Sequence, residues 1–126
     1  MTSRKGFPLA TGVLDYFPDA LMAVAAVSLA GAQQHGTMAG DFPTWKRELS
    51  ADHADALLRH LKDRGRLDTD KHRHSAKVAW RAMALLQEEL EAEMMAEMVQ
   101  QAMQQQQQQQ EEITIPSFLT ADQRED

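Results

Sequence analysis

The sequence is defined first by what it lacks. Its 126 residues include no cysteine, only six glycines and four prolines, and few aromatic residues. The absence of cysteine excludes a disulfide framework and a cysteine-based zinc site, and it is typical of a reducing compartment. No apolar run reaches the ~20 residues that a membrane-spanning helix requires, and no apolar segment directly follows the basic start "MTSRKGF". We therefore expect a cytoplasmic protein with no signal peptide and no membrane partner.

Several catalytic motifs are also missing. The sequence has no glycine-rich phosphate loop, no nucleophile elbow and no His-Glu-x-x-His zinc helix. The formal net charge of −6 disfavours a DNA-binding role, since such domains are basic. These absences exclude the commonest nucleotide-binding and hydrolase signatures, and we expect no specific nucleic-acid partner.

Charge divides the chain into two different parts. Residues 1–87 hold 12 Lys and Arg against 9 Asp and Glu, whereas residues 88–126 hold 1 Arg against 10 acids. The acidic part also contains seven consecutive glutamines at 104–110, a low-complexity segment. We predict an N-terminal arm (1–12), a helical core domain (13–92), and a helical extension with a poly-Gln and acidic tail (93–126).

Breaker residues and caps predict three helices and no strand of convincing length. The first helix runs from Pro18, which suits a first helical turn, to about residue 30, where Gly31 can end it. The second runs from a Ser50 N-cap to about residue 64, and Gly65 stops it.

The third helix begins near Arg73 and meets no breaker until Pro116. The fold class is therefore all-α: a small helical bundle built on an antiparallel helix hairpin, with a long C-terminal helix. Three helices of this size bury a thin core, so we expect a homo-oligomer that completes the bundle.

Helical spacing predicts which side chains share a face. The apolar face of the second helix is expected to carry Ala54, Leu57, Leu58 and Leu61, and that of the third Ala79, Ala82, Met83, Leu86 and Leu90. Each hairpin helix also has a polar edge that contains histidine. These edges carry His53 and His60 in one helix, and His74, Lys77 and Arg81 in the other.

Two acidic residues, Asp68 and Asp70, lie in the loop that joins these helices. One interpretation is functional: the two aspartates, with or without imidazole, bind a divalent metal, and Arg59, Lys77 and Arg81 bind phosphates. The other is structural: the histidines lie at a helix interface and the aspartates cap a helix. The pattern alone favours the structural interpretation.

A family resemblance changes this balance. The segments "ALLRHL" (56–61), "DTD" (68–70) and "AW" (79–80), with His74 between them, resemble the dATP/dGTP diphosphohydrolase N-terminal domain family of phage proteins. That family is similar to the all-α MazG-like nucleotide pyrophosphohydrolases. The resemblance covers roughly residues 14–90 and includes "AGA" (30–32) and Trp45 upstream.

The resemblance implies an activity and a set of site residues. It implies metal-assisted cleavage of a purine deoxynucleoside triphosphate to a deoxynucleoside monophosphate and pyrophosphate, with Mg²⁺ or Mn²⁺ as cofactor, in the host cytoplasm if the protein is phage-encoded. Carried over by position, the candidate catalytic residues are Asp68, Asp70, His60 and His74, with Arg59 nearby.

The chain departs from the family pattern at several positions. Lys77 stands where a second histidine is usual, and Arg81 stands where an asparagine is usual. Glu88 and Glu91 form a Glu-x-x-Glu pattern, but the Glu-x-x-Asp that follows it in MazG enzymes is absent. The alternative function is therefore a non-enzymatic helical interaction protein or virion-associated protein, for which the acidic, glutamine-rich end is suited.

Overall fold

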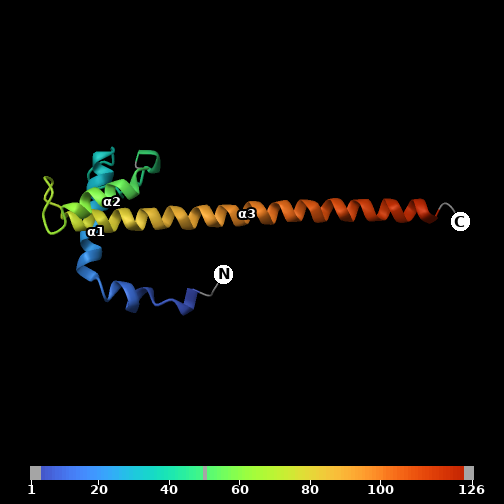
Figure 1. Cartoon of the computed structure of the whole chain (residues 1–126), viewed down its shortest axis with the longest axis horizontal. Helices are drawn as coiled ribbons and strands as arrows, with labels where there is room; N and C mark the ends of the chain where they lie inside the picture. The colour runs from blue at the N-terminus through green and yellow to red at the C-terminus, as the bar shows by residue number, and fades with distance from the viewer. Residues whose placement is uncertain (1–3, 50, 124–126) are drawn as a thin grey trace. The chain divides into compact units, whose positions relative to one another are not determined.

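A computed structural model describes the backbone of residues 4–49 and 51–123 and the side chains of residues 5–49 and 51–112. Every regular element in these ranges is helical, which confirms the all-α class and the long C-terminal helix (Figure 1). In chain order the elements are η1 (Arg4–Gly6), η2 (Ala10–Leu14), α1 (Pro18–Gln34), η3 (Arg47–Leu49), α2 (His53–Lys62) and α3 (His74–Gln123).

Helix α1 begins as predicted at Pro18 but continues past its predicted end at Gly31. Two observations explain the difference. Ala32 is buried, so the turn after Gly31 is held by packing. The residue that takes a left-handed conformation after the helix is Gly36, with φ of 108°, which makes it the glycine that ends the helix.

Helix α2 is shorter than predicted at both ends. It begins at His53, with Asp52 in the N-cap position, and the predicted cap, Ser50, lies outside the described residues. It ends at Lys62, and Gly65 follows with φ of 84°. The glycine therefore terminates this helix as the sequence indicated, because a left-handed backbone is open to glycine at little cost.

Helix α3 continues past Pro116, where the sequence predicted its end. A proline removes one hydrogen bond, to the residue four positions earlier, and strains that turn. The helix can therefore continue after the proline. The chain divides into two compact units, residues 1–86 and 87–126. Among the described residues, no helix is long and apolar enough to cross a membrane.

The core of residues 1–86 is built from small side chains. The buried hydrophobic residues are Ala32, Ala56, Ala76 and Ala84, and the described part of the chain holds no fully buried large side chain. The predicted apolar faces of the helices are largely exposed: Leu58 is 61% exposed and Leu86 is 56% exposed. The helices instead approach each other along the histidine-bearing side, where alanines allow close contact.

Contacts between α2 and α3 run in opposite order along the two helices. His60, near the end of α2, contacts His74 at the start of α3, while His53 at the start of α2 contacts Arg81, two turns into α3. This is the order that an antiparallel pair requires, and it brings the two polar edges together.

Candidate functional site

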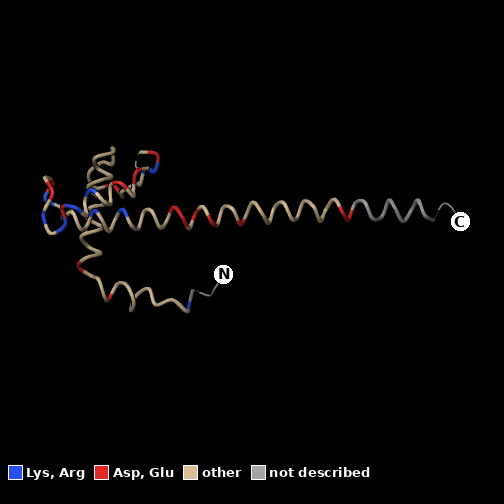
Figure 2. Tube along the Cα trace, in the orientation of Figure 1, with Lys and Arg blue, Asp and Glu red and all other residues tan. Residues whose placement is uncertain are grey.

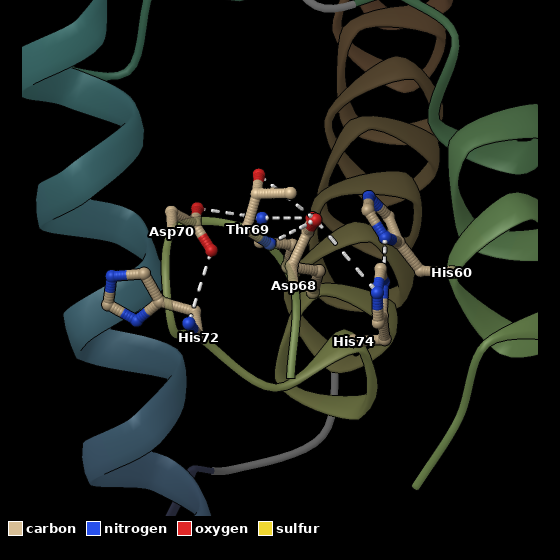
Figure 3. Close-up of polar contacts among 7 residues, drawn as sticks. His60, Asp68, Thr69, Asp70, His72 and His74 are labelled. Carbon is tan, nitrogen blue, oxygen red and sulfur yellow. Dashed lines mark hydrogen bonds and ion pairs between the residues drawn. The ribbon is translucent and has the colours of Figure 1, made fainter. Parts of the chain in front are cut away.

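The loop between α2 and α3 is a compact turn that presents two carboxylates. The backbone N–H of Asp68 donates to the carbonyl of His72 at 2.8 Å, and Lys71 takes a positive φ of 69° within the turn. Each carboxylate also accepts a local hydrogen bond. Asp68 Oδ1 accepts from the Thr69 N–H at 2.7 Å, and Asp70 Oδ1 accepts from the His72 N–H at 3.1 Å (Figure 3). These bonds orient both side chains before any ligand arrives.

Lys77 joins the two carboxylates. Its Nζ donates to Asp68 Oδ2 at 2.7 Å and to Asp70 Oδ2 at 2.8 Å, and its side chain is only 17% exposed. The hydrogen bond from Lys77 is the main reason that the pKa of Asp68 falls to about 2 and that the pKa of Asp70 is also lowered. Burial disfavours the charged Lys77, but its bonds to the two aspartates outweigh this and raise its pKa. All three groups are therefore charged at neutral pH.

His60 and His74 form an imidazole pair beside Asp68. Their Nδ1 atoms lie 2.9 Å apart, and Asp68 Oδ1 lies 3.9 Å from His74 Nε2. Burial, followed by the charges of Lys77 and His74, lowers the pKa of His60, which keeps its imidazole neutral. Figure 3 shows Asp68 beside the histidine pair, with the His72 ring on the other side of the loop.

This arrangement, the His60–Asp68–His74 cluster, has the donor set of a metal site. One ligand atom from each residue lies within 4.8 Å of the others. Two imidazoles and a carboxylate suit divalent transition ions, and neutral imidazole is the form that coordinates. Of the two predicted metal ligands, Asp68 belongs to this cluster. Asp70 does not belong to it, and its Oδ2 accepts a hydrogen bond from Lys77 at 2.8 Å.

Arg81, one turn beyond Lys77 on α3, contacts the start of α2. Its Nη1 lies 3.1 Å from His53 Nδ1 and 3.5 Å from Asp52 Oδ1. Arg59 donates to Asp52 Oδ2 at 2.9 Å, and this bond is the main cause of the lowered pKa of Asp52. Arg59 was predicted to bind phosphate, but its 64% exposed side chain is directed to Asp52 and it is not among the residues that line the pocket described next.

A pocket of about 250 Å³ lies between α1, the segment before η3, the end of α2, the α2–α3 loop and the first turns of α3. Its wall carries three basic side chains, three imidazoles, one carboxylate and two indoles. These are Lys46, Lys77 and Arg81; His35, His60 and His72; Asp70; and Trp45 and Trp80. The positive side chains outnumber the single carboxylate, which suits a polyanionic ligand.

The pocket contains residues that the sequence analysis did not select. His35 and Lys46 follow no motif, and Lys46 Nζ donates to the His35 carbonyl at 2.6 Å across the end of α1. His72 was not selected either, although it lies only two residues after Asp70. Figure 2 shows Lys and Arg beside Asp residues in and around the α2–α3 loop. Only the fold brings the α1 end to this loop, so spacing along the chain gave no signal for His35 or Lys46.

Comparison with known proteins gives one finding. No curated protein and no solved structure matches the chain. A family model, described as dATP/dGTP diphosphohydrolase, N-terminal, matches residues 5–98, which include the whole cluster and every residue of the pocket wall. The chain therefore belongs to the dATP/dGTP diphosphohydrolase N-terminal family.

Proposed function

We propose that this chain hydrolyses purine deoxynucleoside triphosphates to the monophosphate and pyrophosphate, with a divalent cation held by His60, Asp68 and His74. The observation that carries the proposal is the position of Lys77. It lines a pocket rich in basic side chains and at the same time binds Asp68 of the cluster. A triphosphate in this pocket lies beside the cluster. Family membership supports the substrate class, since the family is described by its action on dATP and dGTP.

In this proposal, each group of pocket residues has a different role. Arg81 and Lys46 line the wall and bind phosphate oxygens, because guanidinium and ammonium groups pair strongly with phosphate. Lys77 orients Asp68 through a 2.7 Å bond and neutralises part of its charge. A bound divalent cation supplies charge neutralisation at the phosphates and a lowered pKa for an attacking water. Trp45 and Trp80 give the pocket apolar surface against which a purine ring can pack.

The reaction forms one bond and breaks another at the α-phosphorus. Water adds to that phosphorus, the bond to the oxygen that bridges the α and β phosphates breaks, and pyrophosphate leaves. Asp70 lines the pocket and stays outside the cluster, so its carboxylate accepts the proton of the water. This role separates it from Asp68, which lies with the histidines.

Hydrolysis of a panel of deoxynucleoside triphosphates, with Mg²⁺ or Mn²⁺ and with a chelator, tests the proposal. We expect release of pyrophosphate from dATP or dGTP, which the chelator stops. Asp70→Asn should lose hydrolysis and keep metal binding, whereas Asp68→Asn should lose both. Asp55→Asn, an exposed change in the first turn of α2, is the matched control and should remain active. A folded wild-type protein that hydrolyses none of the nucleotides contradicts the proposal.

A second candidate function, a helical interaction module, is favoured by the exposed apolar residues of α3. Large hydrophobic side chains there are 46–62% exposed: Leu90, Met94, Met95, Met98, Val99 and Met103. A dimer or tetramer formed by this chain would cover them. Light scattering tests this against the 14.2 kDa chain mass, and replacing Met94 and Met98 by Glu should return a monomer. An inactive oligomer would favour this function over hydrolysis.

A further inference from the structure

His53 is the most deeply buried polar side chain in the described part of the chain. It is 2% exposed, the only polar residue buried there. Its ring lies 6.0 Å from the ring of Trp45 and 6.0 Å from the ring of Trp80, edge to face with both. Both tryptophans line the pocket, but His53 itself does not. A polar group is costly to bury among aromatic rings unless it makes a hydrogen bond, so the partner of His53 is informative.

That partner is the guanidinium of Arg81. Arg81 Nη1 lies 3.1 Å from His53 Nδ1. A guanidinium can only donate, so Nδ1 must accept, and the imidazole is neutral with its proton on Nε2. Asp52 Oδ1, 3.5 Å from the same Nη1, gives the guanidinium a second, weaker anchor. Arg81 also lines the pocket, so the residue that His53 contacts is part of the pocket wall.

We infer that His53 is a positioning residue that holds the Arg81 guanidinium against the pocket wall for a phosphate group of the ligand. The inference rests on the proposed function, in which Arg81 binds the triphosphate. An unanchored arginine must lose the freedom of several side-chain bonds when it binds, which weakens the complex. The hydrogen bond to Nδ1 restricts the Arg81 side chain before the ligand binds, so less conformational freedom is lost on binding. The acceptor can do this because the ring of His53 is itself held between two indoles.

Two variants separate positioning from packing. In His53→Asn the amide oxygen can stand near the place of Nδ1, so it can accept a hydrogen bond from Arg81. In His53→Phe the ring still fills the space between the tryptophans but offers no acceptor. Asp55→Asn serves again as the control, because it changes charge in the same helix turn away from the pocket. Circular dichroism checks that each variant is folded.

Two measurements on the full chain decide the question. The first is the ¹⁵N signal of the Arg81 side chain without ligand, which reports whether the guanidinium is held. The second is binding of inorganic tripolyphosphate, followed by fluorescence of the only two tryptophans, both in the pocket wall. We expect wild type and His53→Asn to bind equally at about pH 8, and His53→Phe to bind about fivefold to tenfold more weakly, which is the net value of about one hydrogen bond.

Each other outcome has a clear meaning. If His53→Phe keeps the Arg81 signal and the wild-type affinity, the inference is wrong. If His53→Asn is folded but loses as much as His53→Phe, His53 has only a packing role. A third outcome is that the Arg81 signal shows a held guanidinium in wild type and His53→Asn but not in His53→Phe, while the wild type binds no tripolyphosphate. In that case the contact between His53 and Arg81 stands and the proposed function fails.

Discussion

Replacing Asp68 by Asn tests the electrostatic description of the α2–α3 loop. The pKa of Asp68 falls from 3.8 to about 2, chiefly through its hydrogen bond with Lys77. That lowering corresponds to at most ~2.4 kcal/mol of native-state stability. The side chain is 24% exposed, so solvent screening reduces the value, and we expect a loss of about 1 kcal/mol in Asp68→Asn at neutral pH. Lys77 keeps its bond to Asp70, which limits the loss further.

The dependence on pH gives the sharper result. A carboxyl whose pKa is lower in the folded state stabilises the fold above the unfolded pKa, near 4, and stops doing so as the pH falls through the folded pKa. The difference in unfolding free energy between wild type and Asp68→Asn should therefore be constant down to about pH 4 and shrink towards about pH 2. Urea unfolding followed by circular dichroism measures it. A difference that is absent at pH 7, or unchanged at about pH 2, would refute the reasoning.

Three further predictions follow from the structure. His74→Ala should weaken Mn²⁺ binding by at least about tenfold in calorimetry, since it removes one of three ligands, while His35→Ala should not. The pKa of His60 is lowered mainly by burial, so as the pH falls the unfolded state binds a proton on His60 at a higher pH than the folded state does. Stability should then fall more steeply below about pH 6.5 in wild type than in His60→Gln, and equal slopes would count against it. Deleting residues 111–126 should leave the thermal midpoint of residues 1–86 nearly unchanged, and a drop of many degrees would show that the tail stabilises them.

Much of the candidate site was predictable because it is local. His60, Asp68, Asp70, His74 and Lys77 lie within 18 consecutive residues, and a helix, a tight loop and a second helix bring them together. The part that was not predictable is the division of roles. The sequence paired Asp68 with Asp70 at one metal, whereas in the structure Lys77 binds both and leaves Asp68 with the histidines. That division depends on the direction of each side chain, which spacing does not give.

The sequence by itself determined the all-α class, the three main helices, the glycine that follows α2 and the family, because helix propensity, breakers and motifs act over a few residues. Only the tertiary structure decided which faces pack. Helical periodicity placed the leucines on the apolar face of each helix, but the helices meet along the side that carries alanines and histidines, since small side chains allow close approach. The tertiary structure also joined the end of α1, Trp45 and the α2–α3 loop into one pocket, because contacts between distant segments depend on packing that no local pattern records.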